Sequence, residues 1–213
     1  MLERANFQRH IFNKESTMDL AREPRYVCLD FETNGFPGAK GAPRSDWTLP
    51  WSSFPIQLNV DIVKHGEVTH AMDTLIQGAQ QFAPWVRENV PITHADLDDH
   101  GAHFEDVVEQ LGALLRDGDV IVAHNVRFDL ETVLARTASK MDYDSPALRM
   151  ILSAPRFCMM RCAYNRMALG SNPGMAKLCE HFQVPLEGAH DARVDSAALA
   201  ECVAEAWRRG VML

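Results

Sequence analysis

The order of strand-like and helix-like segments constrains the fold of this chain more than any other feature. Three strand-like segments come first: the apolar run 25–31, the alternating segment 56–63, and the segment 67–76 that follows a His65–Gly66 turn. Further on, helices are expected over 103–117, 125–138, 175–182 and 191–209, and short strands over 119–123 and 157–160. This order predicts an α/β fold with a mixed five-stranded sheet flanked by helices.

Length and charge limit the domain organisation and the class of partner. The chain has 213 residues and a formal net charge of −8. We expect one domain over 25–213, preceded by an N-terminal tail over 1–24. The acidic balance disfavours a wide basic groove for long duplexes. It allows a pocket for one or two terminal nucleotides, because bound metal can supply the positive charge there.

Cysteine usage and hydropathy point to an intracellular protein. None of the five cysteines forms a Cys-x-x-Cys pair, and four of them lie in apolar runs. They are interpreted as small buried thiols in a reducing compartment. We expect neither a secretory signal nor a membrane contact, since no apolar segment has the required length.

The first motif of chemical interest is Asp30-x-Glu32, at the end of the first strand-like run. Residues two apart on a strand share a face, so both carboxylates are expected to point the same way. Two like charges on a buried strand repel each other unless a cation lies between them. The alternative interpretation is a solvated strand end.

The second motif, His124-Asn125-x-x-Phe128-Asp129, follows a buried strand and opens a helix. Asn125 and Asp129 are four residues apart and should share one helical face, with Phe128 beside them to press on a base or sugar. The alternative is an N-capping Asn followed by a surface Asp.

The third motif, His190-x-x-x-x-Asp195, lies at the start of the Ala-rich last helix. A histidine can exchange a proton near neutral pH, which suits a general base. The alternative is an ordinary capped helix with an exposed Asp. Together the three motifs place four carboxylates and one imidazole at strand ends and helix starts. Such an oxygen-rich set suits Mg²⁺ or Mn²⁺ and indicates metal-assisted hydrolysis of a phosphodiester.

These motifs resemble those of the DEDDh-type 3′–5′ exonucleases of the RNase H-like superfamily, which include proofreading subunits and RNase T. The resemblance covers about 25–208 and is carried by the segments 30–35, 92–96, 123–129 and 188–195. It implies an RNase H-like fold and removal of nucleoside monophosphates from single-stranded or frayed 3′ ends of RNA or DNA. A role in RNA processing, a place in a larger nucleic-acid-processing complex and a homodimer are further expectations from the resemblance.

The resemblance also implies roles for individual residues. Two divalent cations, Mg²⁺ or Mn²⁺, would be held by Asp30, Glu32, Asp129 and Asp195, with Asp30 bridging them, and His190 would activate the attacking water. The terminal nucleotide would contact a further set: Thr33, Asn34, Gly35, Ile92, His94, Leu97, Asn125 and Phe128. Within that set, Ile92 and Leu97 would form the apolar pair that stacks on the last bases. Ala95 is a departure, because the family often has Gly there.

Other functions stay open at this point: a proofreading-type DNA exonuclease subunit, a non-catalytic binding module on the same fold, or an RNase H-like endonuclease. The segment Gly35–Pro55 is expected to be a long loop, whose Trp47, Trp51 and Phe54 either stack on bases or cover the sheet edge. His94, His100 and His103 are interpreted as incidental residues of a polar loop. Lastly, four basic side chains either contact phosphates or are solvated surface charge: Arg156, Arg161, Arg166 and Lys177.

Overall fold

A five-stranded mixed sheet forms the centre of the computed structural model, which describes residues 24–35 and 53–211. The strand order is β3-β2-β1-β4-β5. β1 pairs antiparallel with β2 and parallel with β4, β2 pairs antiparallel with β3, and β4 pairs parallel with β5. The bounds are β1 (Tyr26–Thr33), β2 (Pro55–Lys64), β3 (Glu67–Leu75), β4 (Val120–Ala123) and β5 (Arg156–Cys158).

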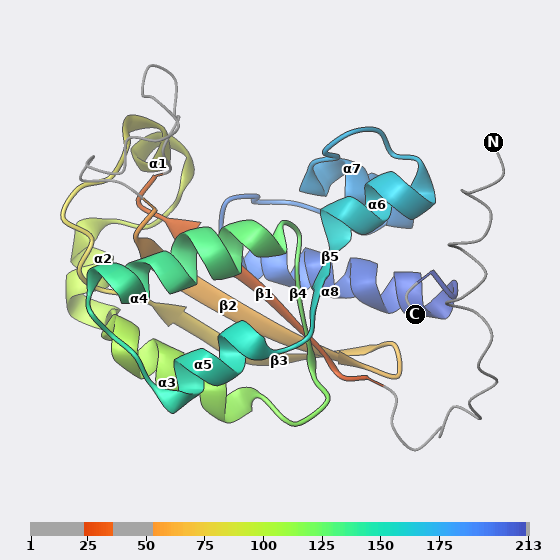
Figure 1. Cartoon of the computed structure of the whole chain (residues 1–213). Coiled ribbons are helices and arrows are strands. Elements are labelled where there is room, and N and C mark those ends of the chain that lie inside the picture. Colours follow the sequence, from red (N-terminus) through yellow and green to blue (C-terminus); the bar gives the residue numbers. More distant parts are fainter. Residues whose placement is uncertain (1–23, 36–52, 212–213) are drawn as a thin grey trace, which may run out of the picture.

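One face of the sheet packs against helices from the middle of the chain (Figure 1). These are α3 (Phe104–Leu114), the π-helical segment η2 (Phe128–Ala135), α4 (Arg136–Lys140) and α5 (Pro146–Ser153). Because side chains alternate along a strand, β1 sends Val27, Leu29 and Phe31 into this core. The apolar stripe of α3 closes it with Phe104, Val107, Val108 and Leu111.

The other face packs against the C-terminal helices α6 (Met159–Met167), α7 (Met175–Phe182) and α8 (Ala192–Arg208). Figure 1 shows α8 running behind the sheet, where small residues such as Ala200 and Ala204 allow a close approach. Four of the five cysteines are buried as free thiols, and Cys158 is half-buried. The interpretation of the cysteines as small core residues therefore holds for those four.

Two short helices, α1 (Pro84–Asn89) and α2 (His94–His100), lie at the end of the sheet where β1 finishes (Figure 1). They form a third apolar cluster with Ile56 of β2. Thr93 caps α2 through a capping box, in which its side chain accepts from the Asp96 amide and Asp96 accepts from the Thr93 amide.

The structure confirms the α/β class, the mixed five-stranded sheet and most element positions, including α7 at the expected bounds. The polar-loop interpretation of His94 and His100 is wrong, because both lie on α2 and the capping box makes that segment helical. The strand expected over 157–160 ends earlier, at Cys158, where α6 begins. The helix expected from residue 125 is confirmed, with a π-helical centre in place of a regular α-helix.

Part of the chain discussed from the sequence lies outside the described residues. This holds for residues 1–23 of the expected tail and for the loop residues Trp47 and Trp51. Phe54 is described and packs between two of the apolar clusters. Its placement agrees with the interpretation that it covers the sheet. No helix within 24–35 or 53–211 is both long and apolar enough to cross a membrane.

The contact between α3 and α5 yields a stability prediction. A Cβ atom placed on Gly112 would lie 2.5 Å from the Ala147 Cβ, which is closer than two non-bonded carbon atoms can approach. We expect Gly112→Val to lower the free energy of unfolding by about 2–3 kcal/mol through overpacking. Urea denaturation measures this change. Gly174→Ala is the control, because nothing lies within 4 Å of that position. Equal stability of both variants would contradict the close packing.

Candidate active site

The first two carboxylates lie near the carboxyl end of β1 and share its α8 face. Asp30 lies opposite Asn59 of β2, and Glu32 lies opposite Gln57. Directly opposed residues in an antiparallel pair point to the same side of the sheet. Both carboxylates are half-buried there. The β1–β2 pairing thus places two acids and two buried amides on the same side of the sheet.

The third carboxylate, Asp129, comes from η2, which packs on the face of the sheet opposite α8. It lies near the start of η2 and is only 3% exposed, so the interpretation as a surface Asp is wrong. The main-chain N–H of Phe31, between the two β1 acids, donates to Asp129 Oδ1 at 3.3 Å. This bond fixes the third carboxylate against the strand that carries the first two.

His190 and Asp195 come from the start of α8. Asp195 lies in the first turn of the helix, and its Oδ2 accepts from the His190 main-chain N–H at 2.9 Å. His190 has φ = 73°, a left-handed conformation that is unusual for a residue with a side chain. Its ring also packs edge-to-face on Trp85 of α1, with 4.7 Å between centroids. Asp195 therefore holds the main chain of His190 and Trp85 contacts its ring, while the residue stays exposed to solvent.

The ligand atoms of Glu32, His190 and Asp195 lie within 4.8 Å of one another. Asp30 lies near this group, because burial and then the charges of Asp129, Glu32 and Asp195 raise its pKa. Residues far apart in the chain, from β1, η2 and α8, thus meet at one edge of the sheet. All five residues singled out from the three sequence motifs are brought together.

Burial and mutual repulsion shift the carboxyl groups toward their neutral forms. Burial, followed by repulsion from Asp195, raises the pKa of Glu32 to about 8. Burial raises the pKa of Asp129 to about 7, although the Phe31 N–H favours its ionised form. Burial also raises the pKa of Asp195, against the opposing effect of the hydrogen bond from His190. At neutral pH the cluster is therefore poorly compensated by protein groups alone.

This donor set fits a divalent cation. Asp195 Oδ1 is buried and has no hydrogen-bond partner among the described residues. An unpaired buried oxygen is costly, and a cation removes that cost while it relieves the repulsion between carboxylates. Carboxylate oxygens suit Mg²⁺ or Mn²⁺ by ligand type.

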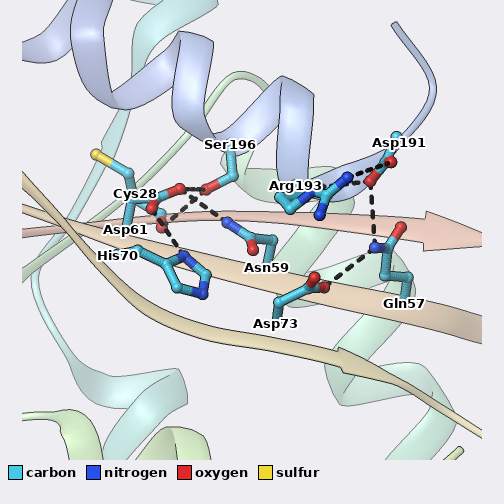
Figure 2. Close-up of polar contacts among 9 residues, drawn as sticks. All are labelled: Cys28, Gln57, Asn59, Asp61, His70, Asp73, Asp191, Arg193 and Ser196. Carbon is cyan, nitrogen blue, oxygen red and sulfur yellow. Dashed lines mark hydrogen bonds and ion pairs between the residues drawn. The ribbon is translucent and has the colours of Figure 1, made fainter. Parts of the chain in front are cut away.

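A buried polar network behind the acids fixes α8 on the sheet (Figure 2). Asp61 of β2 is 3% exposed, and its Oδ2 accepts from Ser196 of α8 at 2.7 Å and from Asn59 Nδ2 at 2.8 Å. Its Oδ1 lies 3.1 Å from His70 Nδ1. Because Ser196 follows Asp195 directly, the network sets the position of the fourth acid.

Gln57 holds the first residues of α8 (Figure 2). Its Oε1 accepts from the Ala192 main-chain N–H at 3.0 Å, and its Nε2 donates to Asp191 Oδ1 at 3.2 Å and Asp73 Oδ1 at 3.1 Å. Asp191 in turn caps the helix by accepting from Arg193 N. Sequence reasoning missed Gln57 and Asp61. The signal that could have found them is the polar side of β2, which pairs with the side of β1 that carries Asp30 and Glu32 and lies on the same face of the sheet.

The residues expected beside the terminal nucleotide differ in how far their side chains are free to contact a ligand. Asn34 is 1% exposed, and its side chain bonds inward, donating to Gln81 O and accepting from Phe54 N. Thr33 Oγ1 donates to Gly35 O. These contacts shape the turn at the end of β1, and any contact of this turn with a nucleotide stays a prediction.

The apolar pair differs from its expected role. Ile92 is 8% exposed and Leu97 is 1% exposed, and both pack in the third apolar cluster. Leu97 therefore offers no surface to a base in this structure, because the capped α2 turns it inward. His94 stacks on Phe82 at 4.2 Å. Asn125 and Phe128 are half-buried beside Asp129, where Phe128 packs partly on the core. Their contacts with a sugar or base stay predictions.

Comparisons with known proteins identify the family and the fold. The family model RNase_T, described as "Exonuclease", matches residues 27–203. The chain therefore belongs to this exonuclease family, and its fold is that of the RNase H-like DEDDh-type exonucleases. Among curated protein sequences, none matches this chain.

Several solved structures share the fold at low sequence identity. A 3′-exonuclease that recognises the 3′ end of the histone mRNA stem-loop has a TM-score of 0.72 at 12% identity, over 88% of this chain and 83% of that one. Exonuclease X, solved with 5′ overhanging duplex DNA, has a TM-score of 0.60 at 18% identity, over 88% and 93%. The zinc-bound complex of E. coli ExoI with single-stranded DNA has a TM-score of 0.64 at 19% identity, over 88% of this chain and 41% of that one.

The raised pKa values predict how stability depends on pH without metal. In the folded protein Glu32 and Asp129 hold protons that the unfolded chain releases above about pH 4–5. The free energy of unfolding should therefore fall as pH rises from about 5 to about 8 in EDTA. Each kcal/mol lost lowers Tm by about 2–4 °C.

Mn²⁺ should reverse this loss, most strongly near pH 8, where it adds about 2.7 kcal/mol at 100 times its Kd. Melting curves across the pH range, with EDTA or with Mn²⁺, measure both effects. In Glu32→Gln the pH dependence in EDTA should be flatter, since one titrating group is gone. A Tm in EDTA that stays constant or rises between these pH values would contradict the clustered site.

The hydrogen bonds from Gln57 to the first residues of α8 give a further prediction. Gln57→Met keeps the approximate size of the side chain but leaves the buried Ala192 N–H without an acceptor. We expect a loss of about 1–3 kcal/mol in the free energy of unfolding, measured by urea denaturation. The exposed Gln80→Met is the matched control and should change stability by less than about 0.5 kcal/mol. If both variants unfold alike, Gln57 does not hold the helix.

Proposed function

We propose that this chain is a metal-dependent 3′–5′ exonuclease that releases nucleoside monophosphates from single-stranded or frayed 3′ ends of RNA or DNA. The observation that carries the proposal is the convergence of Asp30, Glu32, Asp129 and Asp195 beside the exposed imidazole of His190. Membership of an exonuclease family supports the class of reaction.

In the proposed reaction, a water oxygen attacks the last phosphodiester and the bond from phosphorus to the 3′ oxygen breaks. The mononucleotide leaves with a 5′ phosphate, and the shortened strand keeps a 3′ hydroxyl. Divalent cations at such sites supply charge neutralisation and polarisation of a phosphoryl oxygen. The four carboxylates would hold two of these ions, Mg²⁺ or Mn²⁺.

The role proposed for His190 is that of a general base that takes the proton of the attacking water. Its ring is exposed and lies close to Glu32 and Asp195, so it can face a phosphate held at the carboxylates. The bond from its main chain to Asp195 and the contact with Trp85 limit its motion. Holding a base in place removes part of the entropic cost of the reaction.

The structural neighbours support two parts of the proposal: degradation from the 3′ end and a single-stranded or frayed substrate. One of them is a 3′-exonuclease, and others were solved with single-stranded DNA or with 5′ overhanging duplex DNA. An extended strand end can bring its last phosphate to a cluster at a sheet edge more easily than a stacked duplex can, which supports single-stranded or frayed ends.

Substitutions in the cluster test the proposal directly. We expect Asp30→Asn to reduce mononucleotide release from a 3′ end to background, because it removes a charge at the centre of the cluster. His190→Ala should lower kcat by about 10²–10⁴, the usual contribution of a general base. Both are measured in Mn²⁺ as the stepwise shortening of a 5′-labelled oligonucleotide, which accompanies each mononucleotide released.

The exposed Asp98→Asn is the control and should keep full activity. Matched RNA and DNA oligonucleotides report the preferred sugar, and a circular single strand should stay intact. Full activity in both site variants would overturn the proposal, and cleavage of the circle would assign the site to an endonuclease.

A further inference from the structure

A cavity of about 540 Å³ is lined by residues of η2, β5 and α6 and carries a concentration of positive charge. Four arginines and one glutamate line it, which leaves three positive charges in excess on a chain whose net charge is −8. We call it the arginine cavity; its charged residues are Arg127, Glu131, Arg156, Arg161 and Arg166.

The arginines are only partly neutralised by the protein. Glu131 is shared, because its carboxylate lies 3.2 Å from Arg127 Nε and 3.5 Å from Arg156 NH1. Arg166 donates to the main-chain oxygen of Val211. Arg161 is exposed and forms no hydrogen bond or ion pair with the described part of the chain. The cavity therefore keeps guanidinium donors for an external anion.

The cavity is built from one face of α6 and an apolar floor. Arg161 and Asn165 are four residues apart, as are Cys162 and Arg166, so two adjacent rows form the face of α6 that lines the cavity. Buried Val126 and half-buried Phe157 form the apolar floor beside this face. A charged rim over an apolar floor suits a ligand with phosphates along one side and sugars or bases along the other.

Its place in the fold relates the cavity to the carboxylates. β1, β4 and β5 run parallel, so their carboxyl ends meet at one edge of the sheet. Asp30 and Glu32 lie near that end of β1, while Phe157 lies in β5 and Val126 follows β4. Val126 and Asp129 are about one helical turn apart, roughly 5 Å along the axis.

We propose that the arginine cavity binds the phosphodiester backbone of the substrate strand a few nucleotides before its 3′ end. This inference rests on the proposed exonuclease function and adds a second contact with the same strand. Guanidinium groups pair well with phosphate oxygens, and counterions released from the strand favour the contact. The cavity would retain the strand while successive terminal nucleotides enter the acidic site.

Binding of single strands of different length tests the proposal without catalysis. In an Asp30→Asn background that blocks cleavage, Arg161→Gln should raise the Kd of an oligonucleotide of about 12 nucleotides by about 3–10-fold. The salt dependence of log Kd should fall by about 0.7 for the one lost phosphate contact. The Kd of a dinucleotide, which is too short to span both sites, should change much less.

Two further variants sharpen the test. Glu131→Gln removes the only carboxylate among the charged residues of the cavity and should lower the Kd of the long strand by about 2–3-fold. Arg116→Gln is the matched control, because the exposed Arg116 precedes β4 and so lies at the opposite edge of the sheet. This control should bind both strands as the parent does.

The results separate the two proposals. If the chain degrades 3′ ends but Arg161→Gln binds the long strand like the parent, these arginines are solvated surface charge and the cavity proposal is overturned. A polyglutamate peptide of matched charge that displaces the labelled long strand as well as the unlabelled strand does would also overturn the proposal. That result would assign the cavity to an acidic protein segment. Failure of the proposed function shows separately, as absence of mononucleotide release by the unmodified chain.

Discussion

Repulsion among four carboxylates is the constraint on which the rest of this structure depends. Asp30, Glu32, Asp129 and Asp195 come from three different elements, and burial removes the water that would otherwise screen them. A protein without a use for such a cluster would gain stability by separating the acids. Here main-chain N–H groups hold two of them in place, Phe31 N–H at Asp129 and His190 N–H at Asp195. The fold therefore maintains an arrangement that becomes favourable once a cation is bound.

The docking of α8 is how the fold resists this repulsion. The helix carries Asp195 and follows His190, so its start has to stay beside β1 even though the charges push it away. Gln57 binds the first helical N–H, and Asp61 binds Ser196 from the same strand, β2 (Figure 2). Both β2 residues are buried, so these bonds act where water competes poorly. Small apolar residues further along α8 bind it to the sheet with close packing.

The sequence was most informative where local pattern decides structure. Apolar runs located β1 and β4, and three short motifs contained the five residues that the structure brings near one another. It was least informative for α1 and α2, since helices of six and seven residues carry too few turns for a periodic pattern. Gln57, Asp61 and Trp85 were missed for a different reason. Their importance arises from partners distant in the chain, namely α8 and His190.

Net charge says little about individual surfaces, because it averages over regions that act separately. The value of −8 disfavours a wide basic groove for long duplexes, and the arginine cavity is a smaller basic surface at the carboxyl edge that also holds the acidic cluster. Charges separated by more than about 8–10 Å are largely screened in solution, so a polyanion responds to each surface on its own. A strand held by arginines on one side could approach carboxylates on the other only when cations neutralise them. If both proposals hold, metal binding and strand binding at this edge would be coupled through electrostatics.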